Sequence, residues 1–393
     1  MKVTFLQKDL AQACALLQNI VSSTTPIAVL KNLLLETNGD QVIFTASDYD
    51  TFARLSIPAK VATKGKLTLP AKTFADLVKE LPNADVSLEA KGTKAQVKCE
   101  GLSFQLATMP ADDFPEFPEF KASTTLVLPQ AELRVALERV ACAMPSRDPR
   151  RVLLGCLFDL RGEEIRLVAT DGKKLIKNTL MVAGVDGPAT SAIVPAKMVN
   201  ELIRQLDEAG TVRIQFGERR ILFDTGRVTS IASVIEGDYP PYDLVIPKAF
   251  DLKVRVPREP LMADLRRASI VQDKNEYAVM LRFQQNALTV SARGHELGTF
   301  EGSIPIEFKE SKFEIVFNYV FLQDILKATG GGDTLLMKMN NPGTPAVLER
   351  EGDPQAIYLI MPIKQADMQP VAEDEAPDDD DEEPTEEESD RRF

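Results

Sequence analysis

Apolar residues recur at helical spacing in three segments of similar length. In the first segment the apolar positions are three or four residues apart: Leu10, Ala13, Cys14, Leu17 and Val21. This spacing places them on one face of a helix and predicts that the face is buried. The three predicted helices span residues 8–21, 130–143 and 258–271. Each follows a short run in which apolar and polar residues alternate, as in a half-buried strand.

A second helix is predicted later in each of the three regions. These helices span residues 70–81, 195–206 and 319–330. The first two begin at a proline, and the third ends at a glycine, which are common residues at the start and just past the end of helices. Related segments also precede these helices: residues 44–48 resemble residues 167–171, and residues 289–293 are at the equivalent position in the third region. Asp171 lies 123 positions after Asp48, and Arg293 lies 122 positions after Asp171, so the chain is a threefold internal repeat.

The repeat predicts the fold class. Each copy has two helices and about eight short strands, spaced too closely for helical crossovers, so the sheets should be mostly antiparallel and the class α+β. We expect domains at residues 1–121, 126–247 and 250–365, with boundaries after proline-rich stretches. A chain of 393 residues is long enough for several such domains.

The carboxyl end differs in charge from the rest of the chain. Residues 366–393 contain 14 acidic residues against two arginines, a net charge of −12, which leaves 44 basic and 45 acidic residues and a net charge of −1 for the rest. The acidic segment should be a disordered tail. Because the body is nearly neutral, the total of −13 does not argue against nucleic-acid binding. The four cysteines are far apart, and neither a signal peptide nor a long apolar run is visible, which favours a cytoplasmic protein without membrane contact.

Few residues offer catalytic chemistry. His295 is the only histidine, and the run Gly330-Gly331-Gly332 lacks the lysine of a phosphate-binding loop, so we expect no cofactor, no metal and no enzyme activity. The turns at Asp48, Asp50 and Asp171 could hold a divalent ion, although such turns use aspartate for backbone reasons. A carboxylate-metal hydrolase and a scaffold of repeated domains that never meets DNA therefore stay open as alternatives.

Four short segments, in this order and spacing, closely resemble one known family. They are Lys-Asn-Leu-Leu-Leu at 31–35, Thr-Met-Pro-Ala-Asp-Asp-Phe-Pro at 108–115, Val-Ala-Thr-Asp-Gly at 168–172 and Tyr-Leu-Ile-Met-Pro at 358–362. Residues 1 to 365 resemble the β sliding clamp of bacterial DNA polymerase III, a non-catalytic processivity factor. The resemblance implies three tandem clamp domains, a six-domain ring formed by a head-to-tail homodimer, and helices lining a hole that encircles double-stranded DNA without regard to sequence.

The resemblance also implies a DNA-facing surface of scattered cations. Scattered cations can bind DNA phosphates without contacting the bases, and a protein that slides along DNA needs contacts of this kind. We expect DNA contacts from the residues Lys72, Lys79, Arg147, Arg150, Arg151, Lys197, Arg204 and Arg266. The same helices carry Lys8, Arg134, Arg139, Arg267 and Lys327. The loop at 147–151 is the most basic in the body.

A second implied surface is a hydrophobic cleft between the second and third domains. There the family's replicative polymerase, clamp loader and repair partners insert a short peptide. Matching positions are Leu153, Thr170, Gly172, Lys173, Lys174, Leu175, Pro240, Val245, Phe321, Thr344, Ala346, Ile360, Met361, Pro362 and Ile363. Leu244 replaces an arginine that is common there, and Gln365 replaces a terminal leucine. Peptide preference is therefore expected to differ.

The third implied surface closes the ring. Phe104 and Leu106 of one chain are expected to meet Ile270 and Val271 of the other. Pairing would also cover strand edges that invite aggregation when left open. The largest departure from the family is the acidic tail, which could screen the neighbouring cleft or repel competitors of DNA.

Overall fold

Three repeats follow one another along a crescent in the computed structural model, which describes residues 1–22, 24–274 and 276–364. In the first repeat the helices are α1 (Gln7–Leu17) and α2 (Ala71–Lys79). Its strands are β1 (Lys2–Leu6), β2 (Asn32–Asn38), β3 (Gln41–Ser47), β4 (Thr51–Pro58), β5 (Lys60–Thr63), β6 (Lys66–Pro70), β7 (Asp85–Lys91), β8 (Lys94–Cys99) and β9 (Leu102–Ala107).

The second and third repeats contain the same parts except for a counterpart of β5. In the second, the helices are α3 (Gln130–Ala141) and α4 (Ala196–Gln205), and the strands are β10 (Thr124–Pro129), β11 (Gly155–Arg161), β12 (Glu164–Thr170), β13 (Lys174–Met181), β14 (Thr190–Pro195), β15 (Thr211–Phe216), β16 (Arg220–Asp224) and β17 (Val228–Ser233). In the third, the helices are α5 (Arg258–Ala268) and α6 (Tyr319–Ala328), and the strands are β18 (Leu252–Pro257), β19 (Ala278–Gln284), β20 (Ala287–Gly294), β21 (Gly298–Pro305), β22 (Phe313–Asn318), β23 (Thr334–Met339), β24 (Ala346–Arg350) and β25 (Ala356–Ile360). The α+β class with antiparallel pairing is confirmed.

Two of the sheets cross from one repeat to the next. One has the strand order β10-β15-β16-β17-β4-β3-β2-β6, so β17 of the second repeat pairs with β4 of the first. The other has the order β14-β11-β12-β13-β25-β24-β23-β18, and joins the second repeat to the third through β13 and β25. Smaller sheets, β5-β1-β7-β8-β9 and β21-β20-β19-β22, lie at the two ends. Each end sheet has a free outer strand, β9 or β21.

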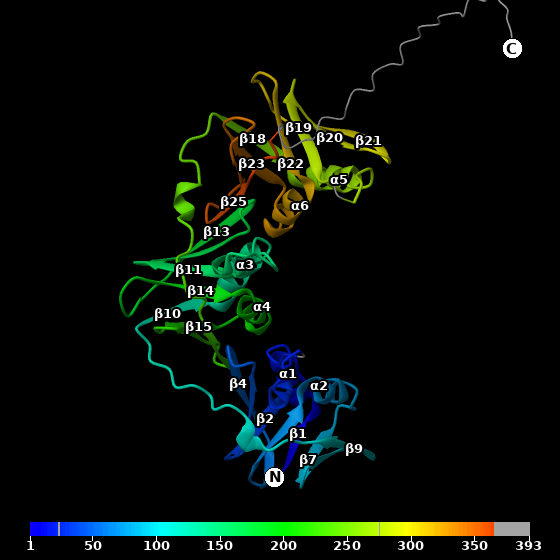
Figure 1. The fold of residues 1–393 in the computed structure, drawn as a ribbon, viewed down its shortest axis with the longest axis vertical. Coiled ribbons are helices and arrows are strands. Elements are labelled where there is room, and N and C mark those ends of the chain that lie inside the picture. Colours follow the sequence, from blue (N-terminus) through cyan, green and yellow to red (C-terminus); the bar gives the residue numbers. More distant parts are fainter. Residues whose placement is uncertain (23, 275, 365–393) are drawn as a thin grey trace, which may run out of the picture.

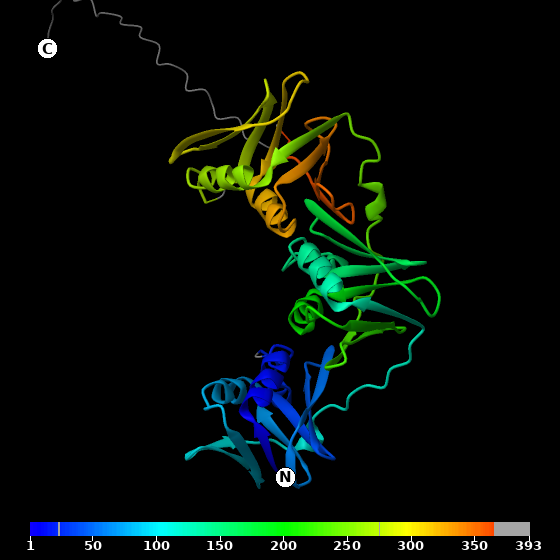
Figure 2. The same cartoon turned by 180° about the vertical axis from the view of Figure 1, so that it is seen from behind.

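Helices line the concave side of the crescent, and the sheets form its outer layer (Figures 1 and 2). Four helices follow a proline directly: Pro70, Pro129, Pro195 and Pro257. Its fixed backbone angle suits a helix start, where no partner for its missing N–H is needed. Helix α6 begins differently, because the Asn318 side chain accepts hydrogen bonds from the backbone N–H groups of Val320 and Phe321.

Most of the buried apolar residues form one core in the first repeat and a second core that continues through the other two repeats, and two smaller clusters lie apart from these cores. Leu10 and Leu17 of α1 are fully buried, as their spacing predicted. That helix ends at Leu17, however, rather than at residue 21, and α5 ends at Ala268 rather than at residue 271. Ile270 and Val271 therefore lie in the turn after α5.

Candidate nucleic-acid, peptide and subunit interfaces

Cationic side chains are exposed on the helices of the concave side. Lys72 and Lys79 on α2, Arg204 on α4 and Arg266 on α5 are all accessible to solvent. Arg204 also pairs with Glu201 one turn earlier on α4. Exposed cations on a curved helical surface suit phosphate contacts that carry no sequence information.

Lys197 is held at the joint between the first two repeats. Its Nζ atom donates to the carbonyl oxygen of Ile20 at 2.6 Å and to Asp48 Oδ2 at 2.5 Å. Asp48 also accepts a hydrogen bond from the backbone N–H of Thr51 at 2.7 Å. Because one carboxylate already balances this ammonium, Lys197 attracts phosphate less strongly than the exposed cations of α2.

Arg139 lies in the joint between the second and third repeats, not on the concave surface. Its guanidinium donates to Asp353 Oδ2 at 2.5 Å and to Asn178 Oδ1 at 2.9 Å, and its side chain is only 9% exposed. Arg350 pairs with the same carboxylate at 2.7 Å. The expectation that Arg139 is one of the DNA-facing helix cations was wrong, because helical spacing alone cannot tell a surface arginine from one paired across a joint.

The basic loop at 147–151 follows α3. Arg147, Arg150 and Arg151 are all exposed. Arg150 forms a two-pronged ion pair with Asp148, with both N–O distances 2.9 Å, and these hydrogen bonds keep the pKa of the Asp148 carboxyl below its usual value. The Arg150 guanidinium also covers Gly172, where an added Cβ would lie 3.1 Å from its nitrogen. Arg147 and Arg151 are therefore the loop's most available cations.

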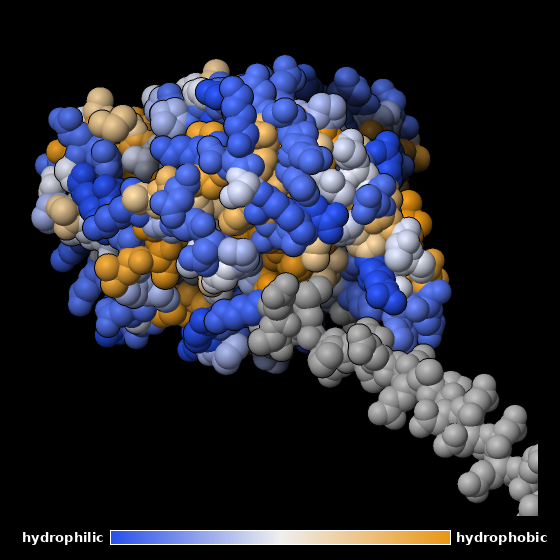
Figure 3. Space-filling model, turned by 90° about the horizontal axis from the view of Figure 1, so that it is seen from above, coloured by the Kyte–Doolittle hydropathy of each residue, from blue (hydrophilic) through white to orange (hydrophobic). Residues whose placement is uncertain are grey.

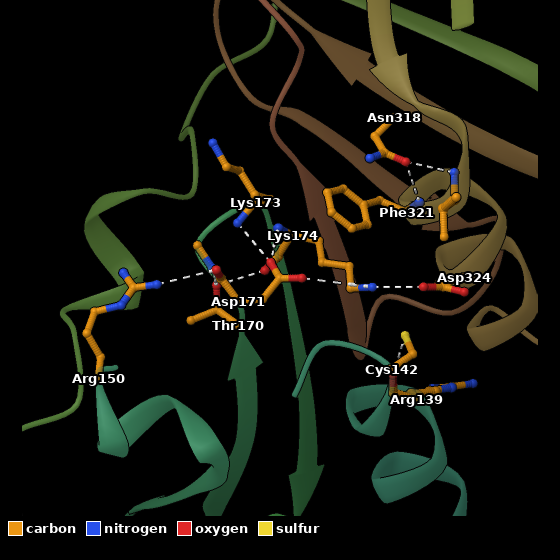
Figure 4. A network of polar contacts seen from close by, with 12 residues as sticks. Arg139, Cys142, Arg150, Thr170, Asp171, Lys173, Lys174, Asn318, Phe321 and Asp324 are labelled. Carbon is orange, nitrogen blue, oxygen red and sulfur yellow. Dashed lines mark hydrogen bonds and ion pairs between the residues drawn. The ribbon is translucent and has the colours of Figure 1, made fainter. Parts of the chain in front are cut away.

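Part of the expected cleft comes together beside the joint of β13 and β25. Lys174 donates to Asp324 Oδ2 at 2.8 Å, and its ammonium lies 4.8 Å from the centre of the Phe321 ring (Figure 4). The backbone N–H of Met361 donates to the carbonyl oxygen of Lys173 at 2.8 Å, and that of Ile363 donates to Val316 at the same distance. These bonds place the segment after β25 between the turn before β13 and strand β22, which leads into α6.

Accessibility divides the cleft residues into a floor and a rim. The buried members are Leu153, Thr170, Lys174, Leu175, Ala346 and Ile360. The partly or fully exposed members are Gly172, Lys173, Pro240, Val245, Phe321, Thr344, Met361, Pro362 and Ile363. Only the second group can contact a bound peptide directly, because the first group packs beneath it.

The two free strand edges are at opposite ends of the crescent. Phe104 on β9 is 39% exposed, and Ile270 after α5 is 74% exposed. Leu106 and Val271 are partly buried. Seen from the end that carries the third repeat, the surface shows apolar patches among hydrophilic residues (Figure 3). Large exposed apolar side chains beside an open strand edge are typical of an association surface.

Several partners of these residues were not foreseen. Asp324 holds Lys174 from 150 positions away, and Asp353 holds Arg139 from 214 positions away. No local pattern marks either aspartate, because each pairing exists only after two repeats have joined. Comparing equivalent positions in the three repeats would have identified the strands on which such contacts form, but not the contacts themselves.

The acidic turns have structural partners. Asp48 binds Lys197, and Asp171 accepts the backbone N–H groups of Lys173 and Lys174 at 2.8 Å each. Within residues 1–22, 24–274 and 276–364, no group of three potential ligands is placed to hold a metal ion. Over the same ranges, no helix has the length and apolar character needed to cross a membrane. Burial raises the pKa of Cys14 to about 12 and that of Cys142 to about 11, so both thiols stay protonated at neutral pH.

Comparison with known sequences identifies the family. Sequence models for the N-terminal, central and C-terminal domains of the DNA polymerase III beta subunit match residues 1–118, 127–241 and 243–364 in turn. The chain belongs to this family. The beta sliding clamp of Pseudomonas putida is 30% identical over 93% of this chain and 100% of that protein. That of Chlamydia pneumoniae is 28% identical over the same shares.

Solved structures of the family have the same fold. The DNA polymerase III beta subunit of Pseudomonas aeruginosa superposes with a TM-score of 0.88 at 28% identity, covering 93% of this chain and 99% of that one. The Bacillus subtilis sliding clamp, at 22% identity and a TM-score of 0.87, supports the fold alone. As a beta sliding clamp, the chain is a non-catalytic processivity factor of DNA polymerase III, which excludes the hydrolase alternative.

Proposed function

We propose that two copies of this chain close head to tail into a ring around double-stranded DNA and tether the replicative polymerase to it. The clamp loader and repair proteins would use the same cleft through a short peptide. The observation that carries this proposal is the repeated strand pairing at the two internal joints, which leaves one matching pair of edges unused.

Strands at equivalent places in the repeats form both internal joints. In the first joint Leu55 of β4 is opposite Val228 of β17. In the second joint Asn178 of β13 is opposite Ala356 of β25. By their positions in the hairpins, β4 and β13 correspond to β21, and β17 and β25 correspond to β9. A third joint of the same kind therefore requires β21 of one chain and β9 of another.

The internal joints also give the register of this third joint. Transferring the pairing places Phe104 of one copy opposite Phe300 of the other, and Leu106 opposite Gly298. Ile270 would lie near this contact at the end of α5. The pairing buries the exposed edges of both end sheets and closes the ring after two chains.

A pair of cysteines tests this register. We expect the variant Phe104→Cys/Phe300→Cys to form a covalent dimer on mild oxidation, because directly opposed residues have Cβ atoms about 4.5–5.5 Å apart. The measurement is non-reducing gel electrophoresis. Phe104→Cys/Glu301→Cys is the matched control, since neighbouring strand residues point to opposite faces. Equal cross-linking of both variants, or of neither, contradicts the register. The native thiols of Cys14 and Cys142, with raised pKa values, should compete little.

Topological retention tests the function itself. We expect the protein, once assembled on nicked circular DNA, to remain bound at about 0.5 M salt and to be lost when the circle is cut. Phosphate contacts alone weaken steeply with salt, whereas a closed ring around a circle cannot leave. Gel filtration of the complex before and after linearisation measures this. Loss at high salt before cutting, or retention after cutting, contradicts encirclement.

The remaining assignments are part of the same proposal. Exposed cations of the concave helices and the loop at 147–151 would contact phosphates, with a smaller contribution from Lys197. We propose the domain limits 1–121, 126–247 and 250–365, and a cytoplasmic location, where the template lies and thiols stay reduced. The predicted acidic tail at 366–393 lies outside the described residues.

A further inference from the structure

A cluster of cations lies where the described chain ends. We define the basic rim as Arg147, Arg150, Lys173 and Lys364. Arg150 reaches the carbonyl oxygen of Asp171 at 3.4 Å, which places the arginine loop against the turn that carries Lys173. Met361 bonds to Lys173 at 2.8 Å, so Lys364 follows three positions after a direct contact with this turn.

The acids next to the basic rim already have partners. Asp148 is held by Arg150, and Asp171 accepts two backbone N–H groups and lies 3.9 Å from the Lys174 ammonium. Asp324 is paired with Lys174. The rim therefore presents a local excess of positive charge, although the body as a whole is nearly neutral.

The chain continues from the rim with its most acidic segment. Residues 366–393 carry 14 acids and two arginines, a net charge of −12. A chain of this length can extend at most roughly 100 Å, at 3.3–3.6 Å per residue, and the rim lies only a few residues from its start. Attachment to the same molecule gives such a segment an effective concentration on the order of millimolar at a nearby site.

We propose that residues 366–393 bind the basic rim of their own chain and compete there with the phosphates of DNA. The inference rests on the proposed DNA contact of the arginine loop. DNA that binds the rim displaces the acidic segment. The segment therefore lowers the affinity for DNA that touches only the rim, and has less effect on DNA that the ring encloses. Because the attraction is between exposed charges, it fades as salt shortens the screening length.

A cycle of variants distinguishes docking at the rim from general repulsion. Four proteins are compared: the full chain, a chain lacking 366–393, the rim variant Arg147→Ala/Lys173→Ala/Lys364→Ala, and the two changes combined. The measurement is the affinity for a labelled linear 20-base-pair duplex at about 50 mM salt. We expect the deletion to tighten binding about tenfold in the native background and to have almost no effect in the rim variant. An equal effect in both backgrounds, or none in the native one, overturns the proposal.

Two further experiments test the charge of the acidic segment and its binding as a separate peptide. A chain of full length whose 14 tail acids are changed to Asn or Gln should behave like the deletion. A synthetic peptide of residues 366–393 should bind the truncated protein at low salt, and not the truncated rim variant. Peptide binding that survives the rim changes but is lost in Phe321→Ala would place the tail in the cleft and overturn the proposal. This peptide assay contains no DNA, so it can succeed even if the circular-DNA experiment contradicts encirclement.

Discussion

Replacing Arg139 by alanine should destabilise the protein by about 3–5 kcal/mol, the usual cost of removing one partner of a buried ion pair. The change leaves the Asp353 carboxylate, 8% exposed, with Arg350 as its remaining partner, and leaves Asn178 without its donor. Asp353 lies across the joint between the second and third repeats, which share one core, whereas Asn178 is on β13 of the same repeat as Arg139. Equilibrium unfolding in urea, followed by circular dichroism, measures the loss.

An exposed arginine on the same helix supplies the control. Arg134 pairs with Glu138 at 3.1 Å, with side chains 40% and 47% exposed, so Arg134→Ala should cost less than about 1 kcal/mol. Asp353→Asn keeps the shape of the side chain but removes the charge, and should destabilise like Arg139→Ala. If Arg139→Ala and Arg134→Ala unfold at the same urea concentration, the buried pair does not hold the joint. If Arg139→Ala also weakens DNA binding in the folded state, its assignment to the joint is wrong.

The sequence predicted most of the fold because the repeats obey short-range rules. Residues such as Leu10 and Leu17 lie on one face at helical spacing, and prolines mark the starts of four helices. Helix ends were less predictable. α1 stops at Leu17 although Ile20 is buried and Val21 is apolar, because apolar residues in the following turn also pack against the core.

The joints could not be predicted from local patterns. The second repeat's β17 adds to the sheet of the first repeat, and β25 of the third adds to that of the second, pairings that depend on contacts between distant segments. The roles of Arg139 and Lys197 follow from these joints, since their carboxylate partners Asp353 and Asp48 come from another repeat. Lys72 and Lys79 on α2 are exposed, as expected of cations on the polar face of a helix.

The two internal joints differ in the side chains beside their paired strands. Beside β13 and β25, the chain after Ile360 bonds to Lys173 and to Val316 of β22, and the Lys174 ammonium lies 4.8 Å from the centre of the Phe321 ring. At the first joint, the position of Lys174 in the turn is taken by Thr51, and Lys197 of α4 is bound to Asp48. The second joint therefore has an aromatic ring beside its own ion pair, Lys174–Asp324.

Replacing Phe321 by alanine should weaken peptide binding about 30-fold, because loss of a buried aromatic anchor typically costs about 2 kcal/mol at an interface. The ring is partly exposed at the rim of the cleft and lies under the Lys174 ammonium. Truncation would remove apolar area that a peptide side chain could cover. The measurement is fluorescence anisotropy with a labelled peptide from the polymerase subunit that the clamp tethers, at a protein concentration where the dimer persists.

Val127→Ala is the matched control for this change. Val127 is 40% exposed on β10, which pairs with β15 in the other long sheet, so its truncation removes exposed apolar area away from the β13–β25 joint. We expect the control to bind the peptide like the parent protein, and both variants to keep the dimer mass. Because Phe321 does not contribute to the strand edges β9 and β21, a loss of peptide affinity with an unchanged dimer mass separates the cleft from ring closure. Unchanged affinity in Phe321→Ala, or an equal loss in Val127→Ala, would place the peptide elsewhere on the clamp.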